Sequence, residues 1–282
     1  MTDGHRHPLV SADELLEALG DPSLRIADVR WFLGEPKRGQ AEYARGHVPG
    51  AVFVDLDRDL AAPPGEGRHP LPDPIGFADR LGELGFGDGH TIVIHDAAQG
   101  QYGARLWWML DRLGHDDAYV LDGGIEAWRS VGGPWTALRS TPMRATMTLA
   151  TEWPGTMDRE EVADAGASVD LVDVRAPERY RGEVEPMERI AGHIPGARNR
   201  PWATLVTDDG HLLPADAIRP LIRGGRERAE RPLVVSCGSG VTACFGMLAA
   251  RVAGLPDPIL YAGSYSDWVG AGLPVAKGPE AG

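Results

Sequence analysis

Short apolar runs alternate along this chain with longer stretches in which apolar residues recur every three or four positions. The runs are rich in β-branched residues and predict buried strands, the clearest of them at residues 24–29, 91–95, 171–174 and 233–236. The spacing of three and four predicts amphipathic helices, and it is formed by Leu106, Met109, Leu110 and Leu113 and by Val241, Cys244, Leu248 and Val252. Strands that alternate with helices are typical of an α/β fold, in which parallel sheets carry helices on both faces.

The same succession of motifs occurs twice, so the chain contains an internal repeat. A strand ending in Asp-Val-Arg occurs at 28–30 and again at 173–175, and a Gly-His-(Val/Ile)-Pro-Gly-Ala segment at 46–51 and again at 192–197. A third strand ends at Asp96 in the first copy and at Cys237 in the second. We therefore predict two tandem domains, residues 1–145 and 146–282, joined in a polar, weakly patterned stretch. A carboxylate at position 96 cannot act as a sulfur nucleophile, so only the second domain is expected to be catalytic.

The candidate chemistry lies in residues 233–243, with the sequence LVVSCGSGVTA. A strand ends at Cys237, a glycine-rich bend follows, and a helical pattern begins directly afterwards. In such a bend several backbone N–H groups converge, and the positive end of the helix dipole lies behind them. These surroundings stabilise the thiolate, which is the nucleophilic form of cysteine. We interpret Cys237 as a residue that does covalent chemistry, and Cys244, on the apolar face of the helix, as a buried structural residue.

The composition limits the partners and the compartment. The chain has 282 residues, of which 24% are charged, and its formal net charge of -13 argues against nucleic acid and anionic membranes as partners. No run approaches the roughly 18 apolar residues of a membrane span, and the first eight residues do not resemble a signal peptide. Two cysteines provide no disulfide framework, so we expect a cytoplasmic protein. We assign no cofactor and no metal site.

Three other interpretations of this segment are open. The first is a buried structural cysteine. The second is a dinucleotide site, because residues 238–243 fit the G-x-G-x-x-G/A pattern, although the candidate ribose-binding acid, Asp257, lies in a turn between two prolines. The third is a cysteine phosphatase, which would need an arginine at the position of Ala243 to clamp a phosphoryl group.

Taken together, the motifs resemble the two-domain rhodanese superfamily. The CGSGVT loop, the paired segments and the terminal Gly-Ser-Tyr-Ser-Asp-Trp carry this resemblance, from about Leu9 to Pro274. It implies two tandem rhodanese-like α/β domains, each a mainly parallel sheet flanked by helices, with catalysis in the second. It also implies a sulfurtransferase, in which Cys237 takes a sulfur atom from a donor as a persulfide and passes it to cyanide or to a thiol such as thioredoxin. The alternative is a low-turnover module for sulfur relay or redox sensing.

The resemblance also assigns roles to individual residues. Ser239 would help to move the thiol proton, in a triad with His69 and Asp57. Asp55 is the alternative acid, because the spacing to the histidine is one residue longer than in the family. The residues of the loop that would surround the donor are Gly238, Gly240, Val241 and Thr242, the two glycines permitting a tight bend. The histidines of the repeated segments, His47 and His193, are interpreted as structural, since both copies contain one.

The loop and its arginines indicate the donor. In the thiosulfate branch of the family two cationic residues follow the cysteine, whereas Gly238 and Ser239 are neutral, as in the branch that uses 3-mercaptopyruvate. Arg179 is the implied anchor for the carboxylate of that donor, because a planar guanidinium can hold a carboxylate at two points. The family's second arginine would fall at residue 186 or 187, which are Pro and Met, and the nearest arginine is Arg189, which could instead be a solvated surface charge. We expect 3-mercaptopyruvate as the donor, with thiosulfate as the alternative.

Overall fold

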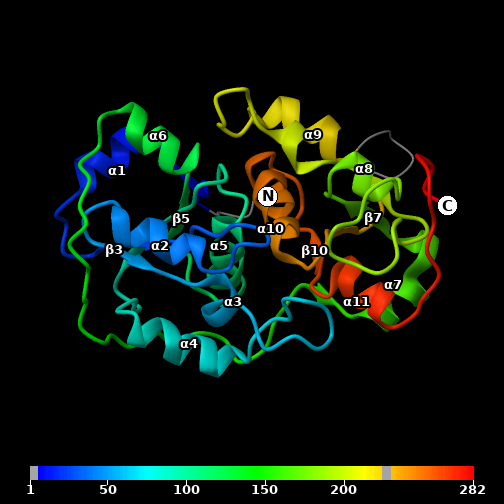
Figure 1. Ribbon diagram of the computed structural model, residues 1–282, viewed down its shortest axis with the longest axis horizontal. Helices are drawn as coiled ribbons and strands as arrows, with labels where there is room; N and C mark the ends of the chain where they lie inside the picture. Colours follow the sequence, from blue (N-terminus) through cyan, green and yellow to red (C-terminus); the bar gives the residue numbers. More distant parts are fainter. Residues whose placement is uncertain (1–5, 224–229) are drawn as a thin grey trace. The chain divides into compact units, whose positions relative to one another are not determined.

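The computed structural model describes residues 6–223 and 230–282, which form two compact units, each built on a five-stranded sheet (Figure 1). Unit 1 contains the chain up to Ala62, then Pro72–Pro154 and Asp209–His211, and unit 2 contains Pro63–Leu71, Gly155–Asp208 and Leu212–Gly282. We predicted a boundary near residue 145; the main division falls after Pro154, and the short segment Pro63–Leu71 belongs to unit 2. The first five residues, part of the stretch without signal-peptide character, lie outside the described residues.

Unit 1 alternates strands and helices as the apolar pattern predicts. Its strands are β1 (Leu9–Val10), β2 (Leu24–Asp28), β3 (Ala51–Phe53), β4 (Thr91–His95) and β5 (Ala118–Leu121). Its helices are α1 (Ala12–Ala18), α2 (Arg38–Arg45), α3 (Leu56–Asp59), α4 (Pro74–Glu83), α5 (Gly103–Arg112) and α6 (Gly124–Ser130). Figure 1 shows α1 and α6 side by side on one side of the sheet and α4 on the other.

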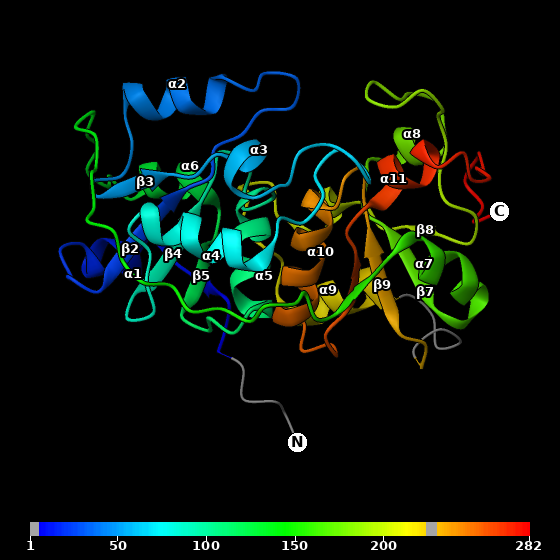
Figure 2. The same cartoon turned by 90° about the horizontal axis from the view of Figure 1, so that it is seen from below.

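Unit 2 repeats this order, and its inner strands are shorter than those of unit 1. Its strands are β6 (Thr156–Met157), β7 (Asp170–Asp173), β8 (Arg198–Asn199), β9 (Leu233–Ser236) and β10 (Ile259–Tyr261). Its helices are α7 (Arg159–Ala165), α8 (Pro177–Tyr180), α9 (Ala215–Arg223), α10 (Val241–Val252) and α11 (Ser264–Gly270), with short 3-10 turns at Gly166–Ser168 and Trp202–Leu205. Helix α9 packs on α10 (Figure 2), and α7 packs on α11. Within the described ranges, none of the helices combines the length and the apolar character that crossing a bilayer requires.

The two sheets have one topology, which confirms the predicted fold. Their strand orders are β1-β5-β4-β2-β3 and β6-β10-β9-β7-β8, and every strand pair is parallel. In unit 1 the ends of β2 and β4 lie together, with Asp28 beside His95, and in unit 2 Asp173 lies beside Ser236. Asp96 and Cys237 therefore leave the central strand of their sheets at the carboxyl edge, where parallel sheets place their binding sites.

The repeated Asp-Val-Arg motif forms the same buried ion pair in both units. Arg30 binds the carboxylate of Asp28 at 2.7 Å and the carbonyl oxygen of Gly46 at 2.9 Å. In unit 2 Arg175 binds Asp173 at 2.6 Å and the carbonyl oxygen of Gly192 at 2.7 Å. Because a buried guanidinium is costly unless it is fully paired, these bonds fix the repeated Gly-His segment of each unit against its sheet.

The two histidines of the repeated segments make the same contacts through Nδ1 and the ring face, although Nε2 of His47 is bonded to the carbonyl oxygen of Leu138 and Nε2 of His193 has no partner among the described residues. Nδ1 of His47 lies 2.8 Å from the carbonyl oxygen of Tyr43, and the two rings stack with their centroids 3.9 Å apart. Nδ1 of His193 lies 2.8 Å from the carbonyl oxygen of Tyr180, with a centroid distance of 3.7 Å. Both rings are buried, which supports the structural role predicted for them.

Candidate active site

Cys237 lies between the end of β9 and the start of α10, as the pattern predicts, and its side chain is buried, with 2% of the residue exposed. Its backbone is fixed by the start of α11. The Cys237 N–H donates to Oγ of Ser264 at 3.0 Å, and its carbonyl oxygen accepts the N–H of Tyr265 at 3.1 Å. Ser264 adopts a φ of 53°, an uncommon conformation for a residue other than glycine. The terminal Gly-Ser-Tyr-Ser motif thus holds the cysteine loop in place.

The two glycines of the loop have different roles. Gly240 has a φ of 77°, and a Cβ there would lie 2.2 Å from the carbonyl oxygen of Ala262, so no other residue fits. Gly238 does not have a left-handed φ, so the expectation that it permits the bend through its backbone angles is wrong. A Cβ on Gly238 would instead lie against two guanidinium groups, those of Arg68 and Arg179. Gly238 therefore leaves room for arginines beside Cys237.

Ser239 and His69 form a hydrogen-bonded pair. Oγ of Ser239, a buried residue, lies 2.8 Å from Nδ1 of His69. His69 comes from the segment Pro63–Leu71, which belongs to unit 2, so the pair lies within one unit. A hydroxyl bonded to an imidazole can pass a proton in either direction, which is the property that the predicted role of Ser239 requires.

The two candidate acids, Asp57 and Asp55, belong to unit 1. Asp57 lies in α3, where its carboxylate accepts the indole N–H of Trp31 at 3.0 Å. Asp55 is the N-cap of α3 and accepts the backbone N–H of Asp57 at 3.0 Å. Burial raises the pKa of Asp55, in opposition to its bonds with the helix. Both carboxylates thus accept hydrogen bonds within unit 1, and the role of Asp57 or Asp55 in a triad with His69 stays a prediction.

Arg179 lies beside the loop, in the place predicted for the carboxylate anchor. Nη1 and Nη2 of Arg179 are each 3.5 Å from the position of a Cβ on Gly238. The guanidinium is held from behind by Glu185, with Nη2 and Oε1 2.7 Å apart. By contrast, Arg189 is exposed and forms no ion pair with the described residues. Arg189 is not among the atoms closest to the Cβ position of Gly238, so its predicted role in donor binding stays a prediction.

The second cation is Arg68, which sequence reasoning missed. Its Nη2 lies 3.0 Å from the position of a Cβ on Gly238, and its Nη1 forms an ion pair with Glu188. The sequence offered a signal, since Arg68 directly precedes the histidine that we singled out. That signal was insufficient, because only the folded chain shows that this segment reaches a loop about 170 residues further on.

The matching loop of unit 1 holds an anion of its own. Oδ1 of Asp96 accepts the backbone N–H groups of Ala98 and Gly100, both at 2.8 Å. Oδ2 accepts those of Tyr102 and Gly103, at 2.7 and 2.8 Å. Asp96 is fully buried, and its carboxylate accepts these four backbone amides from inside the loop. Unit 1 shows that the loop of this fold is a binding site for an anion, here an internal one.

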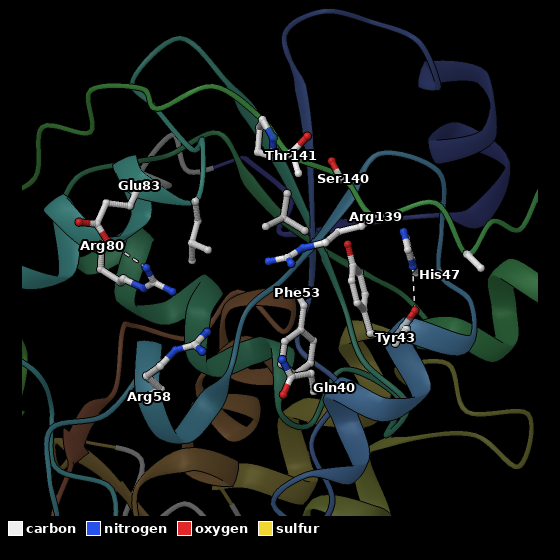
Figure 3. Close-up of a pocket in the computed structure, with 15 residues that line it drawn as sticks. Gln40, Tyr43, His47, Phe53, Arg58, Arg80, Glu83, Arg139, Ser140 and Thr141 are labelled. Carbon is white, nitrogen blue, oxygen red and sulfur yellow. Dashed lines mark hydrogen bonds and ion pairs between the residues drawn. The ribbon is translucent and has the colours of Figure 1, made fainter.

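Unit 1 also contains a cavity that is separate from both loops. Its volume is about 480 Å³, and Figure 3 shows Arg58, Arg80 and Arg139 with their guanidinium groups turned toward it. Arg58 and Arg80 both bind the buried carboxylate of Asp59 at 2.8 Å. None of the predicted catalytic or donor-binding residues lines this cavity. Among the described residues no group of three or more His, Cys, Asp or Glu side chains is arranged to hold a metal ion.

Comparison with known proteins identifies the repeated units. The profile of the rhodanese-like domain matches twice, at residues 11–131 and 158–271. A probable 3-mercaptopyruvate sulfurtransferase from Pseudomonas aeruginosa is 39% identical over 277 residues, covering 93% of this chain and 94% of that protein. A putative thiosulfate sulfurtransferase from Mycobacterium tuberculosis is also 39% identical, over 268 residues, covering 92% of this chain and 93% of that protein. The structure of a 3-mercaptopyruvate sulfurtransferase from Leishmania major superimposes with a TM-score of 0.83 at 31% identity, covering 95% of this chain and 76% of that one.

Proposed function

Because this chain belongs to the rhodanese family, we propose that it is a sulfurtransferase in which Cys237 carries sulfur as a persulfide, with 3-mercaptopyruvate as the preferred donor. The class of enzyme rests on relatives that share more than nine-tenths of their length with this chain and bear the name sulfurtransferase. One of these relatives is named for 3-mercaptopyruvate and another for thiosulfate, and both are 39% identical to this chain. The donor therefore has to be argued from the site.

The observation that carries the proposal is the cysteine loop. Cys237 stands at the carboxyl edge of a parallel sheet, before the first turn of α10, and Ser239 two residues later is bonded to His69. The dipole of a twelve-residue helix favours negative charge at this point. Both a thiolate and a persulfide are anions, so the same surroundings stabilise the resting enzyme and the intermediate.

The first half of the reaction forms the persulfide. The Cys237 thiolate attacks the donor sulfur, an S–S bond forms, and the C–S bond breaks with its electron pair on carbon. The donor thiol loses a proton, and the carbon that has lost sulfur gains one, which leaves pyruvate. Ser239 and His69 are the pair placed to carry this proton, and Asp57 is the proposed third member that orients the histidine.

The second half returns the thiolate. An acceptor anion, cyanide or a thiolate such as that of reduced thioredoxin, attacks the outer sulfur of the Cys237 persulfide. The new bond forms to this sulfur, the S–S bond breaks, and its electron pair returns to Cys237. Neither cysteine of the chain forms a disulfide, which agrees with our proposal that the enzyme works in the reducing cytoplasm.

Intact-mass measurement tests the proposal. Incubation with 3-mercaptopyruvate, followed by removal of the donor, should add the mass of one sulfur atom to the wild type and to Cys244→Ala, but not to Cys237→Ala. Cys244 is a matched control because it is the second cysteine and is also buried. An unchanged wild-type mass, or sulfur retained by Cys237→Ala, would refute the proposal. A turnover number of roughly 1 per second or more with cyanide would exclude a low-turnover relay module.

Thiosulfate remains the second candidate donor, because two guanidinium groups lie beside the loop even though residues 238 and 239 are neutral. We expect kcat/KM to be higher for 3-mercaptopyruvate than for thiosulfate. The opposite order would reassign the donor without affecting the role of Cys237.

A further inference from the structure

Two guanidinium groups from distant segments face one point beside the nucleophile. That point is the Cβ position of Gly238, which lies 3.0 Å from Nη2 of Arg68 and 3.5 Å from both terminal nitrogens of Arg179. Because these distances share one origin, the two guanidinium groups are close neighbours. Like charges at such a distance repel, so an anion is needed to make the arrangement favourable.

Two carboxylates of the chain, those of Glu185 and Glu188, supply negative charge to the arginines. Glu185 binds Arg179 at 2.7 Å and also Arg175 at 3.2 Å, and Glu188 pairs with Arg68. The side chains of Glu185 and Glu188 are 2% and 13% exposed. These carboxylates hold the two arginines in place, and Glu188 pairs with Nη1 of Arg68, whereas Nη2 is the atom of Arg68 nearest to Gly238.

The guanidinium of Arg68 has a hydrogen-bond donor that no described residue accepts. Its Nε is buried and has no hydrogen-bond partner in the described structure. A buried donor without an acceptor is unfavourable, and a bound ligand oxygen would remove that cost.

The segment of Arg68 is also fixed against the loop. The Arg68 N–H donates to Oγ of Ser266 at 3.1 Å, and the N–H of Ser266 donates to the carbonyl oxygen of Gly238 at 2.9 Å. A Cβ on Gly67, whose φ is 88°, would lie 2.9 Å from the carbonyl oxygen of Gly263. These contacts hold the backbone of Arg68 in place next to the cysteine loop.

We propose that Arg68 binds the donor's carboxylate together with Arg179, and that Glu185 and Glu188 are positioning residues for the pair. The inference rests on the proposed function, because it assigns a residue to the binding of that donor. Two neighbouring guanidinium forks can bind the two oxygens of one carboxylate, and they do so beside the residue that directly follows Cys237.

The charges of the cluster favour a singly charged donor. The cluster contains the three guanidinium groups of residues 68, 175 and 179 and the three carboxylates of residues 173, 185 and 188, so their formal charges cancel. A donor with one carboxylate adds a single negative charge, whereas thiosulfate adds two. In a partly desolvated site each uncompensated charge is costly, so this balance disfavours the dianion.

The test compares a charged and an uncharged donor in matched variants. We would measure the rate of Cys237 persulfide formation at low donor concentration, with 3-mercaptopyruvate and with mercaptoacetone, which has a methyl group in place of the carboxylate. Arg68→Met should lower kcat/KM for 3-mercaptopyruvate by about 10- to 100-fold, mainly through KM, since a hydrogen bond to a charged group is lost. Its rate with mercaptoacetone should stay within about threefold of wild type, because that donor never used the bond. Arg181→Met is the control, because Arg181 pairs with Glu183 away from the cluster.

A second variant removes the effect of a stranded charge. Arg68→Met leaves Glu188 unpaired, so the double variant Arg68→Met/Glu188→Gln removes both charges together. If the double variant regains wild-type kinetics with 3-mercaptopyruvate, the loss came from Glu188, and the inference is overturned. It is equally overturned if Arg68→Met slows both donors alike, or if it slows neither.

A binding measurement separates this inference from the proposed function. Pyruvate, which keeps the carboxylate, should protect Cys237 from iodoacetamide, and Arg68→Met should raise the half-protecting concentration by about 10- to 100-fold. Failure of the wild type to accept sulfur from any donor would refute the proposed function, while the protection assay would still decide the role of Arg68. Equal protection of wild type and Arg68→Met would refute the role of Arg68 alone.

Discussion

Replacing Asp96 by alanine should strongly destabilise unit 1, although Asp96 does no chemistry. The carboxylate accepts four backbone N–H groups at 2.7 to 2.8 Å, and it is fully buried. Asp96→Ala leaves all four donors without their acceptor. Hydrogen bonds to a charged group contribute roughly 1.5–3 kcal/mol each.

The four contributions are not additive, because the donors share one acceptor group. Water entering the vacated space would also satisfy part of the loop. We therefore expect a loss of about 3 to 5 kcal/mol in the free energy of unfolding of unit 1, at the upper end of single substitutions. Asp96→Asn should lose about 2 to 4 kcal/mol, because one oxygen is retained while the amide NH2 group faces two N–H donors.

Urea unfolding followed by tryptophan fluorescence measures this loss, because unit 1 contains most of the indoles. Unit 1 holds Trp31, Trp107, Trp108, Trp128, Trp135 and Trp153, and unit 2 holds Trp202 and Trp268. The matched control is Asp79→Ala, whose side chain is 73% exposed and should leave the midpoint almost unchanged. If Asp96→Ala shifts the free energy by less than about 1 kcal/mol, the carboxylate is not what holds this loop together. Cys237 should still accept sulfur in the folded variant, since Asp96 belongs to the other unit.

Two further predictions concern pH. Burial raises the pKa of Glu188, although Arg68 opposes this shift and Glu185 adds to it, so acidification protonates Glu188 before ordinary glutamates and releases Arg68. Because Glu188 positions Arg68 for the donor, KM for 3-mercaptopyruvate should rise as acidification protonates Glu188, at a higher pH than ordinary glutamates require, and Glu188→Gln should have a raised KM that no longer varies there; an unchanged slope in that variant would contradict this coupling. Burial lowers the pKa of His95 in the folded protein. Below about pH 6.5 the unfolded chain therefore gains a proton on this histidine, whereas the folded protein does not. The free energy of unfolding consequently decreases as the pH falls below this value. His95→Phe should flatten the decline in unfolding free energy between about pH 6.5 and pH 5 by up to about 1.4 kcal/mol per pH unit, and an equally steep decline would exclude His95 as its source.

The sequence was sufficient for the strands, the helices and their repeat, which depend on local order. The apolar runs predicted that strands end at Asp96 and Cys237. The internal repeat predicted a second sheet like the first, and the two observed sheets have the same topology. The pairing of Ser239 with His69 was also predicted, although through the resemblance and not from the pattern. In each case the motif that carried the prediction is adjacent in the sequence to the helix or strand that it predicts.

The arginines show where local order was insufficient. Arg179 was predicted because it lies in a recognisable motif, whereas Arg68 was missed and Arg189 was named in its place. Glu188 pairs with Arg68 across 120 positions of sequence, and no spacing rule relates them. Charged side chains are long and usually solvated, so their type and position say little about the partner that burial will select.

The comparison of the two loops gives a physical reason for the unequal roles of the repeats. In unit 1 the residue that follows the central strand is Asp96, and its carboxylate accepts four backbone amides of the loop. An external anion would have to displace a covalently attached one, whose effective concentration is far higher, so we expect that the loop of unit 1 does not bind the donor. In unit 2 the same position carries sulfur, and the cations that would attract a donor are two arginines delivered from other segments. The same position of the fold is therefore taken by a carboxylate that stabilises the loop in unit 1. In unit 2 it is taken by Cys237, the proposed nucleophile.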